Sequence, residues 1–583
     1  MKKRLIYLLI LLTIFGAIAV VFAFQGTTNN IYKQITLLGK VAKVIYTDYV
    51  DPIDYRKLIK GAIDGMTSTL DPHTVFFTPT QYKELQVDTR GKFGGLGIQI
   101  GIRNGWLTII APIEGTPAYR AGLQAGDRII KIEGKSTWGI TVEQAVKKLR
   151  GEPGTKVTIT IQREGEPEPF DVTITRDIIE IKPVPFYGMT EEGVGYIRLS
   201  SFSAEAGHAV KNALEDLISQ GAKGIILDLR YNPGGLLSQA VAVANQFLPK
   251  DALVVYTKGR SFFQNRQYYT DHDGVYKEGK LIVLVDRGSA SASEIVAGAI
   301  QDHDRGLIMG TNTFGKGLVQ SIRPLDGGTA LKITTAKYYI PSGRCIQKED
   351  YLLRRNCAII PDTALYNPDT LDPWSWIYER QPPDTSDTSK AKKEREKPIF
   401  YTAKGRVVYG GGGITPDIKF EPPLLTRLEA ELERKGLFFD FAVHYVATHK
   451  NAIKSPDFEV TDEMIEEFKK FLKEKNFTYK TRSQLVLEQL DSIAVQDSLS
   501  EETMKQLDAL KVRLEAEKEH EFARSLNYIK RAIKRELVSK LFGLKERYKQ
   551  ITLKSDPAIR KAVEIILNDK EYNKYLEVTE KKK

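Results

Sequence analysis

Short apolar runs alternate with segments of helical pattern between residues 183 and 345. The runs at 194–198, 224–228 and 281–285 have the composition of buried strands, and the segments 204–219 and 237–247 have the spacing of helices. This alternation predicts an α/β fold. A chain of 583 residues is too long for one hydrophobic core, so we expect two to four domains.

A cluster of serines follows the apolar run at 281–285. The sequence Gly-Ser-Ala-Ser-Ala-Ser-Glu-Ile-Val at 288–296 places it where the strand gives way to a helix. A serine at such a turn exposes its hydroxyl beside helix N–H groups that stabilise an oxyanion. Ser289, Ser291 and Ser293 are equal candidates on this argument, and simple capping of the helix is the alternative.

A lysine between two glycines follows the next apolar run, at 307–309. Lys316 stands in Thr-Phe-Gly-Lys-Gly-Leu-Val-Gln at 313–320. In a tight apolar setting, a lysine can lose its proton and act as a base. The chain has 7 histidines, but they are scattered and suggest no triad. The two motifs therefore indicate a serine hydrolase that works without histidine.

The turn Asp-Leu-Arg-Tyr-Asn-Pro-Gly-Gly at 228–235 follows another strand. Its backbone can approach a substrate carbonyl closely and donate N–H groups to an oxyanion. The alternative interpretation of the same sequence is an ordinary strand-to-helix turn. The segment 310–317 nearly matches a phosphate-binding loop. However, Gly317 replaces the hydroxyl residue that binds magnesium, so a nucleotide hydrolase is disfavoured.

Charge and composition exclude several other classes of function. The net charge of +11 is dispersed along the chain and no nucleic-acid motif accompanies it, so we expect no nucleic-acid partner. No His/Cys cluster suggests zinc, and 271–274 is too short for a calcium loop, so neither a zinc nor a calcium site is expected. Cys345 and Cys357 form either a disulfide or two separate thiols.

The first 24 residues predict that the chain is directed to a membrane. Three basic residues precede an almost wholly apolar segment at 5–24, which is long enough to span a hydrocarbon core as a helix. The basic flank should remain cytoplasmic and place the body outside the inner membrane, in the periplasm. A signal peptide cleaved near Ala23 is one interpretation; an uncleaved signal anchor fits the length better.

Residues 83–182 contain short β-type runs with glycine turns and one helix from Thr141 to Leu149. Gly-Gly-Leu-Gly-Ile at 94–98, followed by Ala-Gly-Leu-Gln-Ala-Gly-Asp at 121–127, resembles a PDZ domain. The glycine loop would direct N–H groups at a peptide carboxylate, and the adjoining strand would pair with the peptide. The candidate peptide-binding residues are Gly95, Leu96, Gly97, Ile98, Val146 and Leu149.

These patterns divide the chain into seven parts. A signal anchor or signal peptide (1–24) precedes an N-terminal helical segment (25–82), the PDZ-like domain (83–182) and an α/β core (183–345) that carries the serine and lysine motifs. An inserted polar loop (346–400), a return to the core (401–423) and a charged, helical C-terminal extension (424–583) follow. The extension has an apolar stripe at Leu526, Ile529, Ile533, Leu537 and Leu541 that suits packing against the body or a partner.

The motifs in this order resemble the carboxyl-terminal processing, or tail-specific, proteases of bacterial envelopes over about residues 35–423. The resemblance implies a crotonase/Clp-protease-like α/β core with an inserted PDZ domain, and Ser-Lys peptide hydrolysis without a cofactor. It implies that Ser291 is the nucleophile, Lys316 the general base, and Gln320 the residue that orients the lysine. Glu294 would support the serine, and the N–H groups of Ala292 and of Gly234 or Gly235 would form the oxyanion hole.

The same resemblance implies protein substrates with exposed C-terminal tails, bound by the PDZ domain. The long C-terminal extension leaves room for an adaptor or for homo-oligomer contacts. The alternatives are a non-catalytic PDZ scaffold of the envelope, against which the intact Ser291, Lys316 and Gln320 argue, and an acyl-CoA enzyme of crotonase type.

Overall fold

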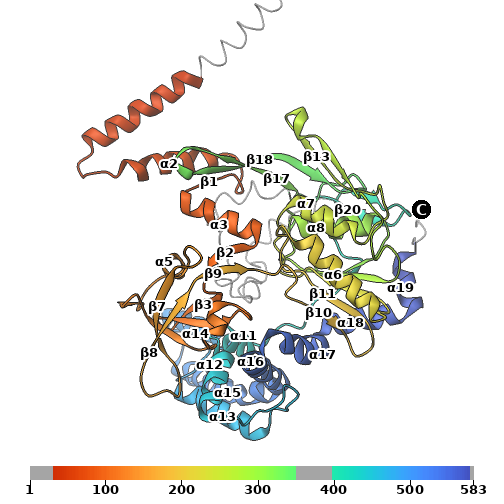
Figure 1. Cartoon of the computed structure of the whole chain (residues 1–583). Coiled ribbons are helices and arrows are strands. Elements are labelled where there is room, and N and C mark those ends of the chain that lie inside the picture. The colour runs from red at the N-terminus through yellow and green to blue at the C-terminus, as the bar shows by residue number, and fades with distance from the viewer. Residues whose placement is uncertain (1–30, 349–396, 578–583) are drawn as a thin grey trace, which may run out of the picture. The chain divides into compact units, whose positions relative to one another are not determined.

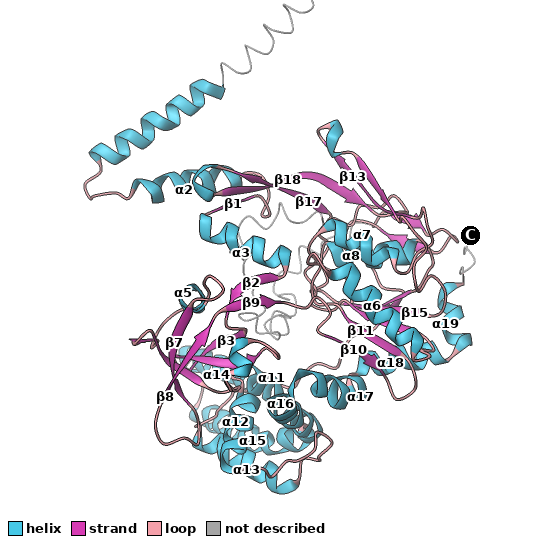
Figure 2. Cartoon of the chain, viewed as in Figure 1, coloured by secondary structure: helices cyan, strands magenta, loops and turns pink. Residues whose placement is uncertain are grey.

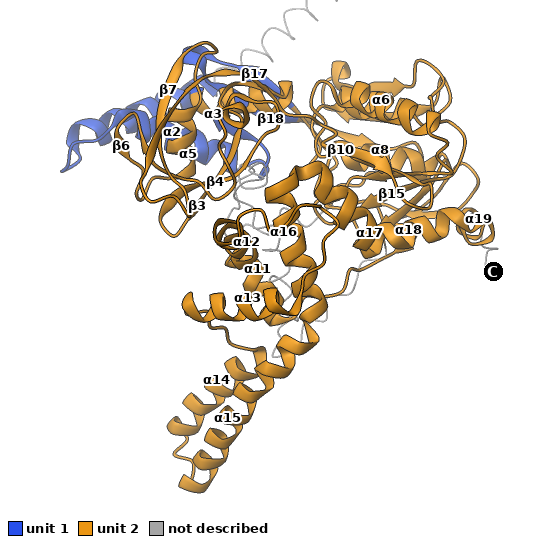
Figure 3. Ribbon diagram, turned by 60° about the horizontal axis from the view of Figure 1, so that its bottom comes forward, with its two compact units in different colours: residues 1–79, 321–334 blue, residues 80–320, 335–583 orange. Residues whose placement is uncertain are grey.

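The computed structural model describes residues 31–348 and 397–577 (Figure 1). Two compact units divide the chain: residues 1–79 with 321–334, and residues 80–320 with 335–583 (Figure 3). Across the described ranges, none of the helices combines the length and the hydropathy required for a membrane span. The apolar segment at 5–24 lies outside these ranges, as does Cys357.

The first unit is mainly helical. Residues 31–48 are helical, α2 spans Tyr55–Ser68, and β1 (Val75–Phe77) pairs antiparallel with the start of β18 (Ala330–Tyr339). The turn before β1 is closed by Asp71, whose carboxylate accepts hydrogen bonds from the N–H groups of His73 and Thr74 at 2.8 and 2.9 Å. This turn links the helix to the strand.

The second unit begins with α3 (Pro79–Arg90) and a PDZ-like sheet in the order β3-β4-β5-β7-β8, with β6 beside β5. Helix α5 (Val142–Leu149) has the predicted N-cap, because the Thr141 hydroxyl accepts from the N–H of Gln144. A separate ribbon of β2 (Lys92–Gly95) and β9 (Asp177–Glu180) lies at the two ends of this segment. The sheet strands are Ile98–Arg103 (β3), Trp106–Pro112 (β4), Arg128–Ile132 (β5), Lys135–Ser136 (β6), Lys156–Gln162 (β7) and Phe170–Thr175 (β8).

The predicted α/β core is confirmed as a six-stranded sheet in the order β10-β11-β12-β15-β16-β21. All neighbouring strands pair in parallel except β10 with β11. Parallel strands are buried on both faces, and this explains their continuous apolar sequences. The strands are Phe186–Met189 (β10), Gly195–Arg198 (β11), Ile225–Asp228 (β12), Leu281–Val285 (β15), Leu307–Gly310 (β16) and Ile418–Lys419 (β21).

Different parts of the chain cover the two faces of this sheet (Figure 2). Helices α6 (Ala206–Ser219), α7 (Leu237–Asn245) and α8 (Ala292–Asp302) pack on one face. The C-terminal helices α18 (Pro557–Leu567) and α19 (Asp569–Leu576) pack on the other. The last described helices therefore complete the hydrophobic core around this sheet.

A second sheet lies beside the core. Strand β13 (Leu253–Gly259) pairs with the end of β18 and forms a hairpin with β14 (Arg266–Tyr269); the short helix η1 (Phe262–Gln264) lies at the hairpin tip. Strand β17 (Leu318–Pro324) also pairs with β18. A small ribbon of β19 (Ile399–Tyr401) and β20 (Val407–Tyr409) precedes β21.

Helices α11, α12, α13 and α16 form an apolar cluster of their own, with Ile529, Ile533 and Leu537 of the predicted stripe buried in it. Leu541, the last residue of the stripe, is 37% exposed. Helices α14 and α15 form a hairpin that projects from the rest of the helical region (Figure 3). The helices are Arg427–Arg434 (α11), Leu437–Thr448 (α12), Asp462–Glu474 (α13), Arg482–Gln496 (α14), Glu501–Arg524 (α15), Leu526–Arg547 (α16) and Leu553–Ser555 (α17).

Candidate active site

Ser291 lies at the turn between β15 and α8, as the sequence predicts. It is the N-cap of α8 and has φ 54° and ψ −111°. A positive φ is strained for a residue with a side chain, and such strain is concentrated at functional sites. A serine held this way before a helix N-terminus has the geometry of a nucleophile at a strand-to-helix turn.

The structure distinguishes the three serines that the sequence left equal. The hydroxyls of Ser289 and Ser293 are fully buried and donate to the carbonyls of Leu229 and Asn232, each at 2.8 Å. These two serines fasten the serine turn to the neighbouring 228–235 turn. Ser291 alone of the three is partly exposed.

Glu294 connects the turn that carries Ser291 (the serine turn, 286–291) to the loop that carries Lys316 (the lysine loop, 311–317). Its Oε2 atom accepts from the backbone N–H of Ser291 at 2.8 Å and from that of Lys316 at 2.9 Å. Its Oε1 atom accepts from the Thr313 hydroxyl at 2.5 Å and from the Gly315 N–H at 2.7 Å. One buried carboxylate therefore fixes the backbone of both candidate catalytic residues.

Burial also sets the protonation of Glu294. Loss of hydration raises the pKa of this carboxyl from 4.5 to about 7, and the four hydrogen-bond donors around it limit the rise. The same donors bear on the phosphate-loop alternative: the N–H groups of Gly315 and Lys316, which a bound phosphate would require, already donate to Glu294.

Tyr338 on β18 makes a second connection between the same two residues. Its hydroxyl lies 3.1 Å from the carbonyl oxygen of Ser291 and within hydrogen-bond distance of that of Lys316. The ring is fully buried, and burial raises the pKa of this phenol well above its ordinary value, so the hydroxyl stays protonated and donates. Glu294 binds the N–H groups, and Tyr338 the carbonyls, of one serine and one lysine.

The lysine loop runs from β16 into β17. Lys316 is half-buried near its end, and Gln320 follows on β17. The neighbouring Gly317 donates its N–H to the side-chain oxygen of Gln347 at 2.8 Å. Hydrogen bonds from the backbone on both sides of Lys316 therefore hold the loop.

The turn after β12 packs directly against the serine turn. Gly234 has φ 101°, and a β-carbon there would lie 2.9 Å from Cβ of Ser291 and 2.8 Å from the amide nitrogen of Ala292. Only glycine permits this approach. The N–H of Gly234 donates to the Asn232 side chain at 2.9 Å. The next residue, Gly235, also has a positive φ, of 148°.

A buried ionic network anchors this turn at its start. Asp228 accepts from Arg230 at 2.7 Å, from Arg198 at 3.2 Å and from the Tyr196 hydroxyl at 2.8 Å. Burial opposes ionisation, but Arg230 and Arg198 outweigh it and hold the pKa of Asp228 below its ordinary value. Arg230 also pairs with Asp556, the N-cap of α18, at 3.0 Å.

Sequence reasoning missed Tyr338, Thr313 and Asp556. Thr313 is the first residue of the lysine motif at 313–320, and its hydroxyl could have been suspected of making a hydrogen bond in the site. Tyr338 occupies a strand with ordinary alternation, and Asp556 is about 260 residues from the serine. Neither carries a signal in the sequence.

The PDZ-like part has the predicted elements in place. Strand β3 lies at the edge of its sheet, and α5 contacts it. Gly97 has φ 79°, and a β-carbon there would clash with Thr116, so the glycine loop before β3 is sterically required. Leu96 and Leu149 are buried, whereas Ile98 and Val146 are half-buried beside the apolar cluster of this domain; Gly95 is buried at the end of β2.

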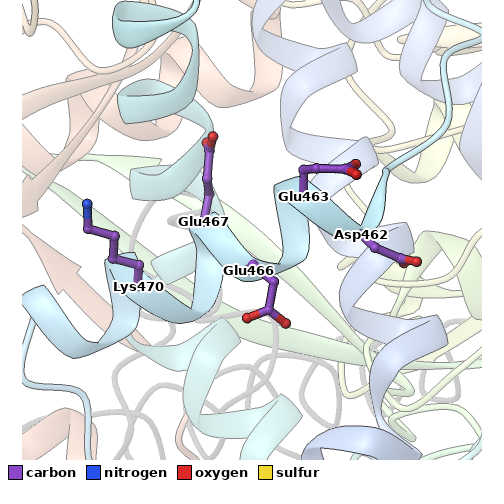
Figure 4. A pocket seen from close by; sticks show the side chains of 5 residues that line it. All are labelled: Asp462, Glu463, Glu466, Glu467 and Lys470. Carbon is purple, nitrogen blue, oxygen red and sulfur yellow. The ribbon is translucent and has the colours of Figure 1, made fainter.

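A depression on α13 is lined by Asp462, Glu463, Glu466, Glu467 and Lys470 (Figure 4). Its side chains form ordinary surface ion pairs, such as that of Asp462 with Lys530 at 2.8 Å. Within residues 31–348 and 397–577, His, Cys, Asp and Glu form no group able to hold a metal ion.

Comparison with protein families matches four parts of the chain. Residues 193–364 match peptidase family S41, residues 108–163 a PDZ domain, and residues 22–79 the N-terminal domain of the activating protease CtpB. Residues 428–566 match the C-terminal helical domain of probable PDZ-proteases. A carboxy-terminal-processing protease of Bartonella bacilliformis is 42% identical over 360 residues, 60% of this chain and 80% of that protein. The chain belongs to the carboxy-terminal-processing proteases.

Two further relatives of this family have similar coverage. A carboxyl-terminal-processing protease of Synechocystis is 41% identical over 54% of this chain and 73% of its own, and CtpA of Bacillus subtilis is 34% identical over 60% and 76%. The solved photosystem II D1 C-terminal processing protease aligns with 31% identity and a TM-score of 0.33, covering 53% of this chain and 83% of that one. The match to peptidase family S41 and the three curated relatives confirm the expected family and serine-type peptidase class.

Proposed function

We propose that this protein is an endopeptidase of the cell envelope that cleaves proteins at or near their C-terminal tails by a Ser-Lys mechanism. The observation that carries the proposal is the pair of shared contacts: Glu294 binds the N–H groups, and Tyr338 the carbonyls, of Ser291 and Lys316. The backbone nitrogens of Ser291 and Lys316 both donate to Oε2 of Glu294, at 2.8 and 2.9 Å, so the two residues lie close together.

In the proposed reaction, Lys316 in its neutral form takes the proton from the Ser291 hydroxyl. The serine oxygen attacks the peptide carbonyl, and the protonated lysine returns the proton to the departing amine. Water then attacks the acyl-enzyme by the same proton transfers and releases the new C-terminus. Gln320 orients the lysine in this scheme.

The N–H groups of Ala292 and Gly235 are the proposed donors to the oxyanion. Ala292 is the first residue of α8, where backbone N–H groups have no partner within the helix. Gly235 is preferred to Gly234 because the N–H of Gly234 already donates to Asn232.

The PDZ domain is proposed to bind the substrate tail. An extended peptide would add to the edge of β3, with its carboxylate at the Gly95-Leu96-Gly97 loop and its last side chain near Ile98, Val146 and Leu149. A membrane anchor at residues 5–24 and a periplasmic body remain part of the proposal; nothing in it requires a cofactor.

The test incubates wild type, Ser291→Ala and Lys316→Ala with a protein that carries an unstructured apolar tail, in free and amidated forms. Mass spectrometry follows the products. We expect cleavage by wild type alone, with the free tail preferred. Tail binding without cleavage by wild type would favour a PDZ scaffold, and equal cleavage of both tails would contradict recognition of the carboxylate.

A further inference from the structure

The tip of the β13–β14 hairpin presents two neighbouring phenylalanines to solvent. Phe262 is 82% and Phe263 79% exposed, and their rings lie edge to face with centroids 6.3 Å apart. Both belong to η1 at the end of the hairpin, which extends away from the core sheet (Figure 2). Exposed aromatic pairs of this kind mark a contact site rather than a packing element.

The tip is held by its own hydrogen bonds. The Thr257 hydroxyl donates to the Gln264 carbonyl at 2.5 Å, and the Gly259 N–H donates to the Asn265 side chain at 2.9 Å. Arg266 reaches back to the Phe263 carbonyl at 3.2 Å. The phenylalanines are thus displayed on an ordered turn, which has little conformational entropy left to lose on binding.

The surroundings of the tip are exclusively basic in sequence. Residues 252–270 contain no Asp or Glu, whereas Lys258, Arg260 and Arg266 lie within them and are exposed. In addition, Lys258 on β13 stands directly opposite Lys337 on β18, which is also exposed. Like charges directly opposite each other on a sheet destabilise it, so a bound external anion would relieve the repulsion between these two lysines.

Two aromatic rings lie under Lys258 of this pair. The ammonium of Lys258 lies 5.4 and 5.2 Å from the ring centroids of Tyr256 and Tyr339, which stack at 5.2 Å. Exposed aromatic tips with a basic rim combine the two features by which proteins hold to membrane interfaces: rings at headgroup depth and cations near anionic lipids.

We propose that this hairpin tip inserts into the surface of an anionic phospholipid bilayer. Phe262 and Phe263 enter the interface, and Lys258, Arg260, Arg266 and Lys337 bind lipid phosphates. The contact is separate from the N-terminal segment and independent of the proteolytic chemistry. It would fix which side of the protease faces the membrane.

The experiment uses the full chain carrying Phe263→Trp, reconstituted in vesicles of phosphatidylethanolamine and phosphatidylglycerol with brominated acyl chains. Phe263 is so exposed that the indole fits without repacking, and an unchanged melting temperature checks this. The unsubstituted chain supplies the background of its 4 tryptophans. Val512→Trp on α15, where Val512 is 72% exposed, is the matched control on a distant surface.

We expect quenching of the residue-263 indole about threefold stronger than that of the residue-512 indole, with a blue-shifted emission. The quenching should fall in phosphatidylcholine vesicles and in Lys258→Gln/Lys337→Gln. Equal quenching at both positions, or none above background, would overturn the proposal. An emission shift that instead grows with protein concentration in lipid-free buffer would assign the tip to contacts between protein molecules and overturn it as well.

Discussion

Glu294 is the buried carboxyl that binds the backbone N–H groups of both Ser291 and Lys316. Four donors bind the Glu294 carboxylate, two on each oxygen. In Glu294→Gln one oxygen becomes an NH2 group, which cannot accept, so the two donors that face it lose their acceptor. We expect Glu294→Gln to lower kcat/KM by about 100-fold with a folded protein, since misplacement of reacting groups costs this much. Steady-state cleavage of a tail substrate and circular dichroism test this; full activity would show that the link is dispensable.

The same residue predicts a dependence of stability on pH. Because its folded-state pKa of about 7 lies above the ordinary 4.5, the folded protein keeps a proton that the unfolded chain releases between these values. The free energy of unfolding should therefore fall as pH rises through this window, by about 3 kcal/mol, and level off above it. Urea unfolding of wild type against Glu294→Gln isolates this contribution. Parallel curves for the two proteins would contradict it.

Tyr338 offers a test of the second connection. Tyr338→Phe keeps the buried ring and removes only the hydroxyl, leaving the carbonyls of Ser291 and Lys316 without their shared donor. We expect a loss of about 1 kcal/mol in stability and a fall of about tenfold in kcat with little change in KM. Tyr339→Phe, the next residue on the same strand, is the control. Equal effects of the two substitutions would mean that the hydroxyl has no special role.

These contacts also show how far the sequence leads at the residue scale. The serine and lysine turns are predictable because the local pattern fixes strand ends and helix starts, whereas the supporting role of Glu294 follows only from the family resemblance. The choice among Ser289, Ser291 and Ser293 depends on which hydroxyls find backbone carbonyls in another turn. Tyr338 is invisible in the sequence because only tertiary packing brings its strand to the site.

At the scale of elements, the α/β core and the capped α5 follow from periodicity and from the Thr141 cap. The role of the C-terminal helices does not. The sequence predicts that the extension packs against the body or a partner through the stripe at 526–541, whereas Ile559, Val563 and Ile566 of α18, outside that stripe, pack against Ile226 and Ile282 on the core sheet. Sheet order and sheet faces are set by long-range pairing, which no local pattern encodes.

Asp556 connects this last helix to the turn that carries Gly234 and Gly235. Asp556→Asn keeps an effective N-cap for α18 but removes the charge that pairs with Arg230. We expect kcat to fall about fivefold with KM and melting temperature nearly unchanged, because Arg230 retains Asp228 but loses its second anchor.

Glu192→Gln is the matched control for this prediction. It breaks the 2.6 Å pair with Arg560 on the same helix, away from the turn. A partial return of kcat in Asp556→Glu would support a positioning role. Identical kcat values for Asp556→Asn and Glu192→Gln would reduce Asp556 to a structural cap.

At the scale of the whole molecule, the PDZ domain is attached to the C-terminal helical region as well as to the protease core. Arg103 ends β3 and donates to Asp440 on α12 at 2.9 Å and to the Gly436 carbonyl at 2.8 Å, with its guanidinium over the Phe439 ring. The strand proposed to bind substrate tails thus begins at the glycine loop and ends on another domain. Tail binding and the helical region should therefore be coupled.

Arg103→Ala tests that coupling. The ion pair is about four-fifths shielded from solvent, and the residue makes hydrogen bonds to a helix start as well, so we expect the contact to lose about 2 kcal/mol. Hydrogen exchange of β3 and α12 should become faster together, and the affinity for a free tail should fall several-fold while Ser291 chemistry on a tail-independent peptide is unchanged. Arg120→Ala, which breaks the exposed pair with Asp177 inside the PDZ segment, should alter neither. Faster exchange in α12 alone would mean that the helical region holds the PDZ domain without influencing its peptide-binding edge.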